Sequence, residues 1–175
     1  MTTIQILVQQ TEKAYEWTHR LMDAVPSENW NIIAEGVSSN MSWQIGHQVI
    51  SIYYHTMMTT IGHVPELIEK LNLQWYTKQC GYDTFAKDMA VEWEAEQLRH
   101  DLRYMQKQSL ALITSLPEPD LWNPVLPTKV PHPVAKTKFE AIDWNIKHTM
   151  WHCGQMATIK RIVDHPYDYG LPKRT

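Results

Sequence analysis

The chain of 175 residues is long enough to bury one hydrophobic core and fits a single domain. Its net charge of −3 and its pI near 6.3 supply no basic field, and no Lys/Arg-rich cluster occurs, which argues against nucleic acid as a partner. The sequence has neither an apolar run of about 18 residues nor a signal peptide, so we expect a cytoplasmic protein that spans no membrane.

The apolar residues of the first third recur with the period of an α-helix. They predict one helix over residues 3–24, which Pro26 ends. A second helix is predicted to begin at Asn40 or Ser42, which are both good N-cap residues, and to run to about Ile61. A glycine and a proline shortly after Ile61 favour an end there.

The middle of the chain alternates helical and irregular stretches. The sequence PELIEKLNL predicts a short helix over residues 65–73, and TKQCGYDT, residues 77–84, is typical of a loop. A long helix is then predicted from about Lys87 to Ser115, with Val91 among the residues on its apolar, inward-facing side.

The last third contains a proline-rich segment and a fourth long helix. Six prolines between residues 117 and 133 exclude a helix there and predict an extended, stiff crossover. The fourth helix is predicted over residues 138–164, and residues 165–175 are too rich in Pro, Gly and polar residues to continue it. Four long helices with one extended crossover predict an all-α fold, a four-helix bundle, in a single domain over residues 1–175.

Three histidines on two of the predicted helices fall on inward-facing rows. His47 lies on such a row of the second helix, and His148 and His152, one helical turn apart, lie on such a row of the fourth. Neutral imidazoles are common ligands of Zn, Ni, Cu and Fe, and three of them with water make an open site. Alternatively, each histidine packs in the core and donates a hydrogen bond to a backbone carbonyl.

The segments that carry these histidines, SWQIGHQVI at 42–50 and HTMWHCGQM at 148–156, resemble the two signature segments of the DinB-like superfamily. The similarity in layout extends over nearly the whole chain. It implies a DinB-like four-helix bundle in up-up-down-down order, one divalent metal on His47, His148 and His152, and frequently a homodimer. Zn and Ni are the metals that we expect first, and Fe after them.

The same resemblance leaves the chemistry open. Family members with an assigned role include S-transferases and isomerases that use a low-molecular-weight thiol, and many others are described as metal-dependent hydrolases. The predicted inner rows are short of carboxylates and offer no convincing general base, so the catalytic residues stay unassigned. This shortage weakens the hydrolase interpretation and leaves room for a metal-activated thiolate as the nucleophile. The non-enzymatic alternative is a ligand-binding bundle with a structural or vestigial metal site.

Residues around the histidines are candidates for a pocket. Gln155, one turn from His152, is predicted either to orient a ligand or to make an interhelical hydrogen bond. Gly154 suggests that another backbone or a ligand approaches closely, because glycine is costly inside a helix. Cys153 is predicted to be a small buried residue and not a ligand. The aromatic candidates for a pocket wall are Trp43, Tyr54, Trp93, Trp144 and Trp151.

Other motifs in the sequence are weak or missing. A ferritin-like di-iron bundle needs two Glu-x-x-His motifs, and only one occurs, at residues 16–19. The chain contains no H-E-x-x-H, no G-x-S-x-G and no glycine-rich phosphate loop. Most of the remaining histidines, including His55, are interpreted as surface residues or as residues behind the site. His132, in the proline-rich segment, is the one that can reach the mouth of the site.

Overall fold

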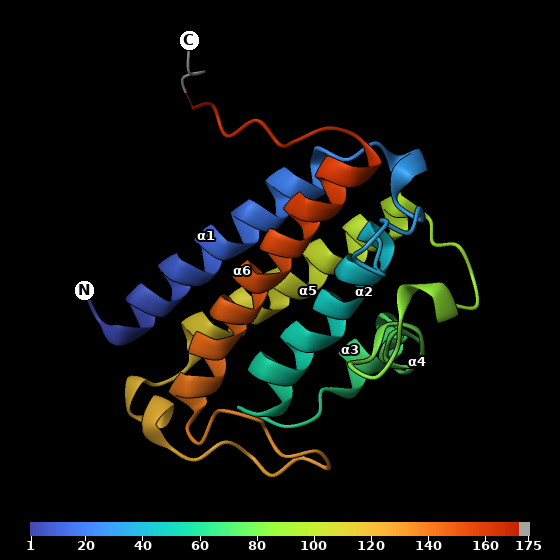
Figure 1. Ribbon diagram of the computed structural model, residues 1–175. Helices are drawn as coiled ribbons and strands as arrows, with labels where there is room; N and C mark the ends of the chain where they lie inside the picture. The colour runs from blue at the N-terminus through green and yellow to red at the C-terminus, as the bar shows by residue number, and fades with distance from the viewer. Residues whose placement is uncertain (172–175) are drawn as a thin grey trace.

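The computed structural model describes residues 1–171. Every named element of secondary structure in this range is a helix (Figure 1). The long helices are α1 (Thr3–Asp23), α2 (Met41–Ile52) with its π-helical continuation η2 (Tyr53–Met58), α5 (Ala95–Ser115) and α6 (Lys138–Val163). The short elements are η1 (Ser27–Asn29), α3 (Pro65–Lys70), α4 (Leu73–Cys80), η3 (Ala86–Asp88) and η4 (Glu118–Trp122). The all-α prediction is confirmed, and none of these helices is long and apolar enough to cross a membrane.

Three of the long helices begin where side chains cap them. α1 and α6 begin in capping boxes, in which Thr2 and Thr137 each accept a hydrogen bond from the backbone N–H three residues further on. Asn40 caps α2 by accepting a hydrogen bond from the N–H of Trp43 at 2.8 Å, whereas Ser42 lies inside the helix. The start of the segment that carries His47 is therefore fixed locally.

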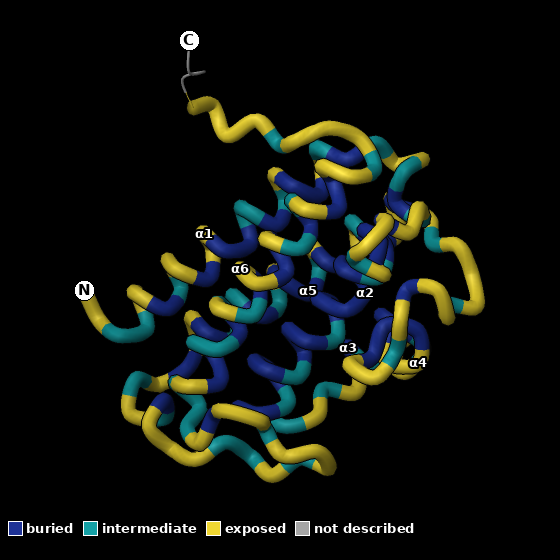
Figure 2. The backbone as a smooth tube through the Cα atoms, in the orientation of Figure 1, coloured by how far each residue is buried: buried dark blue, intermediate teal, exposed yellow. Residues whose placement is uncertain are grey.

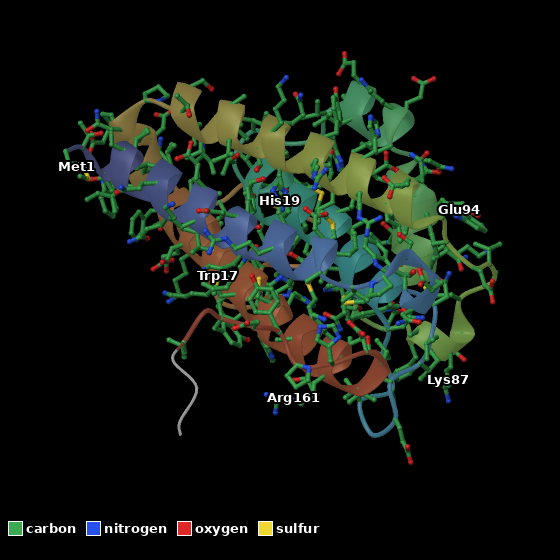
Figure 3. The ribbon with its side chains drawn as sticks, turned by 90° about the horizontal axis from the view of Figure 1, so that it is seen from above. Met1, Trp17, His19, Lys87, Glu94 and Arg161 are labelled. Carbon is green, nitrogen blue, oxygen red and sulfur yellow. The ribbon has the colours of Figure 1, made fainter. Side chains whose placement is uncertain are left out.

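The long helices pack side by side around a shared core. α1 contacts α5 and α6, between which it lies in Figure 3, and α2 contacts the same two helices. Buried residues line the inner sides of all four helices (Figure 2). Trp30, at the end of η1 in the connection between α1 and α2, is also fully buried and donates its indole N–H to the carbonyl of Val25 at 3.1 Å. This packing places α2 next to α6, the two helices that carry the candidate ligands.

The directions of the helices differ from the expected order. α1 and α6 run one way and α2 and α5 run the other way (Figure 1). Asn29, just after α1, donates to the carbonyl of Val163 at the end of α6 at 3.2 Å, so these two helices end together. The N–H of Leu126, before α6, donates to the carbonyl of Thr59, after η2, at 2.8 Å, so α2 ends where α6 begins. The up-up-down-down order implied by the resemblance is therefore wrong.

The connections explain the observed order. Residues 24–40 return the chain at the end of the bundle where α1 stops, which makes α2 antiparallel to α1. Residues 59–94, which contain α3 and α4, carry the chain back along the length of the bundle, so that α5 starts at the same end as α2. Residues 59–94 are therefore the crossover. The proline-rich segment over residues 117–133, predicted to be the crossover, stays at one end of the bundle and connects α5 to α6.

Several boundaries also differ from the prediction. α5 begins at Ala95, eight residues after the predicted start at Lys87. In the irregular stretch before it, the N–H of Ala90 donates to the side-chain oxygen of Gln79 at 2.7 Å, which holds this stretch away from a helical path. Val91, predicted to face inward, is 46 % exposed. The predicted loop over residues 77–84 contributes its first four residues to α4. Inside the proline-rich segment, η4 forms a short 3₁₀ turn where the sequence excludes a helix.

After α6 the chain is irregular through residue 171, as predicted, and part of it packs against α1. The rings of Tyr167 and Tyr169 lie 6.3 Å and 6.1 Å from that of Trp17. The last four residues of the tail predicted over 165–175 lie outside the described residues.

Candidate metal centre

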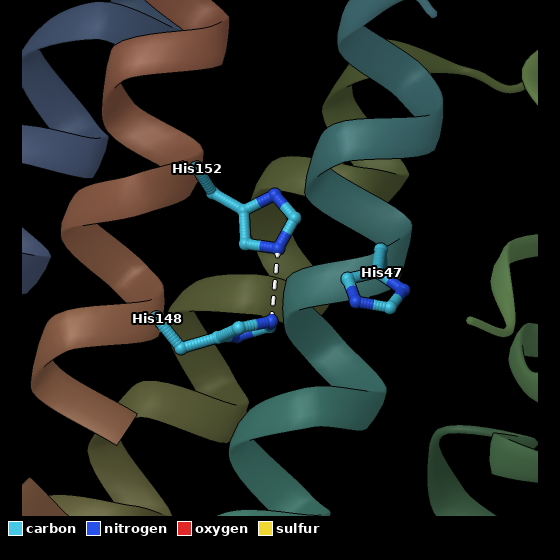
Figure 4. A group of neighbouring side chains, drawn as sticks. All are labelled: His47, His148 and His152. Atoms are coloured by element: carbon cyan, nitrogen blue, oxygen red, sulfur yellow. Dashed lines mark hydrogen bonds between the residues drawn. The ribbon is translucent and has the colours of Figure 1, made fainter. Parts of the chain in front are cut away.

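The three histidines predicted to converge do lie together, between α2 and α6 (Figure 4). One ring nitrogen of each lies within 4.8 Å of one ring nitrogen of the other two. His47 and His152 are buried, with 8 % and 5 % of their surface exposed, and His148 is half-buried. The cluster is therefore formed by side chains from two helices that are about 100 residues apart in sequence and adjacent in space.

Hydrogen bonds fix which ring nitrogen of two of these histidines carries the hydrogen. His47 Nδ1 lies 2.7 Å from the carbonyl oxygen of Cys80, which only accepts, so Nδ1 donates and Nε2 keeps its lone pair. His152 Nδ1 donates in the same way to Gln44 Oε1 at 2.6 Å. Gln44 Nε2 donates to Ser39 Oγ at 3.0 Å, which fixes the orientation of the amide. Both histidines therefore have Nε2 available as a ligand atom, and the hydrogen bond at Nδ1 on the other side of the ring fixes the orientation of each imidazole.

The separation of His148 and His152 fits a metal ion. Their Nε2 atoms are 3.3 Å apart. Two nitrogens bound tetrahedrally at 2.0–2.1 Å from zinc lie about 3.3 Å apart, which is the same spacing. Because Nε2 of His152 carries a lone pair and no hydrogen, it needs a hydrogen from His148 or a cation beside it. The donor set of this cluster therefore matches a divalent ion.

Burial keeps the three imidazoles neutral. It is the largest cause of the lowered pKa of each, followed for His148 and His152 by repulsion from neighbouring histidines, and the pKa of His148 falls to about 4. None of the groups that shift these pKa values is a carboxylate. Neutral imidazole is the form that binds a metal, so the histidines are ready for ligation at neutral pH.

A glycine on α2 lets α4 approach and support His47. A Cβ added to Gly46 would meet Cys80 Sγ at 2.6 Å and Cys80 Cβ at 3.3 Å, so only glycine fits there without movement. This approach brings the Cys80 carbonyl to His47. The close backbone approach predicted at Gly154 is wrong, because a Cβ there would have nothing within 4 Å and the residue is exposed.

A fourth histidine, His55, lies beside the cluster without belonging to it, and of the two positions that the sequence left open for it, the surface and behind the site, the structure has the second. It is 6 % exposed, and its ring centroid lies 5.1 Å from that of His148. In a regular α-helix His55 would point about 80° away from His47. The π-helical turn η2 begins between them, and its wider turn reduces the rotation, which brings His55 toward the site. No motif in the sequence signals this turn.

The aromatic candidates divide between the site and other places. Trp43 stacks on His47, with ring centroids 4.7 Å apart and planes at 8°, and its indole N–H donates to Thr84. Trp144 lies 6.2 Å from His148. Tyr54 stacks on His132, which reaches the site from the proline-rich segment as expected. These three aromatic residues surround the histidines.

The other pocket candidates are more exposed or lie elsewhere. The ring of Trp151 lies 6.4 Å from that of His148, but the residue is 62 % exposed and so does not belong to an inward-facing row. Trp93 packs against Tyr76, at 4.8 Å between ring centroids, in the core. Gln155 is half-buried, and it is Gln44 that holds His152. Helical spacing around His152 gives no sign of Gln44, because this residue lies on α2 and reaches His152 across the interface with α6.

The cysteines do not add ligands. Cys153 is 4 % exposed and lies 3.4 Å from the hydroxyl of Thr18 on α1, which confirms its prediction as a small buried residue. Burial raises the pKa of both thiols, to about 12 for Cys80. Neither is therefore suited to act as a thiolate nucleophile.

Gln44→Leu is expected to lower the affinity for a divalent metal by about tenfold to a hundredfold, because His152 loses the acceptor that fixes its hydrogen on Nδ1. Isothermal titration of the parent and the variant with Zn²⁺ measures the change. Gln48→Leu, a buried glutamine one turn further along α2 that bonds to Met156, is the matched control. Equal losses in the two variants would contradict a specific role for Gln44.

Comparison with known proteins places this site in a family. The chain matches the family model of the DinB superfamily over residues 10–156, and it belongs to that superfamily, as the resemblance suggested. Its structure is similar to the crystal structure of a conserved protein from Enterococcus faecalis, with a TM-score of 0.61 and 16 % identity over 93 % of this chain and 98 % of that one. This likeness shows the fold alone. None of the curated proteins matches the chain.

Proposed function

We propose that the chain binds one divalent metal ion through His47, His148 and His152 and uses it to act on a small molecule. The observation that carries this proposal is the convergence of three imidazole nitrogens, two of which have their lone pairs fixed by hydrogen bonds on the far side of the ring. Three neutral imidazoles suit Zn²⁺ and Ni²⁺ first, and Fe²⁺ as well.

The ligand set favours an open site over a closed one. Within residues 1–171, the convergent group contains no fourth His, Cys, Asp or Glu. Structural zinc sites normally have four protein ligands, whereas catalytic sites have three and keep a position for water or substrate. This difference supports a catalytic role over a purely structural one.

The surroundings favour thiol transfer over hydrolysis. A bound ion supplies Lewis acidity, which polarises a substrate or lowers the pKa of a water or thiol in contact with it. No carboxylate is among the groups that shift the pKa values of the three histidines, which favours a reaction that needs no carboxylate as general base. We therefore rank a metal-dependent S-transferase that uses a low-molecular-weight thiol above a metal-dependent hydrolase.

The test is the metal content of the full-length chain, purified without a metal-binding tag and measured by elemental mass spectrometry. We expect about one ion per chain in the parent, lost in both His47→Ala and His152→Ala. His63→Ala, which removes an exposed histidine outside the cluster, is the control and keeps the ion. An ion-free parent after incubation with Zn²⁺ or Ni²⁺, or variants that retain the ion, would reject the proposal.

If the ion is present, the two enzyme classes are separated by assay. A thiol transferase consumes a low-molecular-weight thiol in proportion to product, whereas a hydrolase turns over with water alone. Product formation that does not depend on added thiol would reverse our ranking of the two classes.

A further inference from the structure

His55 differs from the three candidate ligands in what it contacts. Its Nδ1 lies 2.9 Å from Nε2 of His132, which stands on the proline-rich segment. His132 stacks on Tyr54, with ring centroids 5.6 Å apart and planes at 5°. The Tyr54 hydroxyl donates to the carbonyl of Val130 at 2.8 Å, which ties the proline-rich segment to η2. His132 is therefore held in a defined place beside His55.

The backbone after His132 decides which of its nitrogens carries the hydrogen. His132 Nδ1 accepts the N–H of Ala135 at 2.8 Å and that of Val134 at 3.3 Å, so it has a lone pair and no hydrogen. In a neutral imidazole the hydrogen must then be on Nε2. His132 therefore donates to His55 Nδ1, and the hydrogen of a neutral His55 is on its Nε2.

This arrangement is the reverse of that in the candidate ligands. His47 and His152 each donate from Nδ1 and keep a lone pair on Nε2, as a ligand must. His55 accepts at Nδ1 and carries a hydrogen on Nε2, so it has no lone pair left for a metal. Among the described residues, His55 Nε2 has no hydrogen-bond partner, although the residue is 6 % exposed and its ring lies against His148. This nitrogen is not among the fully buried side-chain atoms that lack a partner, so it stays accessible to an acceptor on a molecule that enters beside His148.

We propose that His55 donates its Nε2–H to an anionic oxygen or sulfur atom of the small molecule that enters the metal site, and that His132 is the positioning residue that fixes this hydrogen. The inference rests on the proposed function, because the acceptor arrives with the molecule that the metal site binds. It assigns His55 to recognition of that molecule and excludes it as a fourth ligand, so the site stays open.

The hydrogen position is tested on the metal-free, full-length chain by long-range ¹H–¹⁵N correlation NMR, which distinguishes ring nitrogens with and without hydrogen. His55→Leu and His132→Phe identify the signals of the two residues. We expect the hydrogen of His55 and that of His132 each on Nε2. A hydrogen on Nδ1 of His55 overturns the proposal, whether or not the chain binds a metal.

Recognition of an anion is tested with the Co²⁺-loaded chain, titrated with azide and followed by visible absorption. We expect His55→Leu and His132→Phe to retain Co²⁺ and to weaken azide binding by about tenfold or more. The phenyl ring of His132→Phe keeps the stack on Tyr54 and removes the donor, so this variant separates hydrogen bonding from packing. His55→Gln, which restores an N–H near the position of Nε2, is expected to recover most of the affinity.

The outcomes separate this inference from the proposed function. If the parent binds no Co²⁺, both fail. If the parent binds Co²⁺ and azide and neither His55→Leu nor His132→Phe changes the affinity for azide, only the inference fails. Loss of Co²⁺ in His55→Leu together with its retention in His132→Phe would identify His55 as a ligand and overturn the inference as well.

Discussion

Replacing His148 with alanine is expected to abolish stoichiometric metal binding and to leave most of the helicity intact. Loss of a residue that only hydrogen-bonds to a metal ligand typically lowers the metal affinity by roughly tenfold to a hundredfold. This substitution removes one of the three ligands itself, so the affinity should fall further. Alanine is the best helix former, and α6 extends over 26 residues with Ile142, Met156 and Ile159 buried in the core. The helix therefore does not depend on His148.

Metal titration together with circular dichroism checks this result. Met150→Ala, a truncation of a residue 42 % exposed on the same helix, serves as the control and should change neither property. Unchanged metal content in His148→Ala would contradict the ligand assignment. A parallel loss of helicity would show that the histidine supports the fold.

Gly46→Ala is expected to destabilise the fold by about 1–3 kcal/mol and to weaken metal binding at the same time. The new methyl group would lie 2.6 Å from Cys80 Sγ, so α4 has to move away from α2. That movement carries the Cys80 carbonyl away from His47 Nδ1, now 2.7 Å distant, and frees the imidazole to turn. Denaturant unfolding gives the stability, and Zn²⁺ titration gives the affinity.

Two controls make this prediction specific. Gly154→Ala, also inside a helix but with nothing within 4 Å of the added Cβ, should be neutral or stabilise the fold by up to about 1 kcal/mol. In the double variant Gly46→Ala/Cys80→Ala the sulfur is gone and the nearest contact is at 3.3 Å, so the two substitutions should compensate. Strictly additive losses would show that the contact with Cys80 is not the cause.

The sequence predicted the long helices from local spacing, and the three-histidine cluster from inward-facing rows together with the resemblance to the DinB-like superfamily. The apolar period and the cap at Asn40 place α2, and the spacing of His148 and His152 puts them on one face of α6. A row at helical spacing does not say how far neighbouring helices cover it. Trp151, one residue before His152 and a predicted part of the pocket wall, is nevertheless 62 % exposed.

Features that depend on distant segments could not be predicted. No residue pattern around YYHTMM distinguishes a π-helical turn from an α-helical one, so the sequence could not place His55 beside His148. The partners of the ligands, Cys80 and Gln44, come from other helices. The helix directions depend on the path of the connections and not on any periodicity.

The placement of the histidines on different kinds of segment has a consequence for how such a protein diversifies. His47, His148 and His152 stand on two packed helices, whereas His132 stands on an irregular connection at one end of the bundle. Connections accept insertions and substitutions far more readily than packed helices do. Under the proposed function, changes in this connection therefore alter which molecules the site accepts while the ion is retained. We expect proteins that share the two histidine segments but differ in this connection to hold similar metals and to act on different substrates.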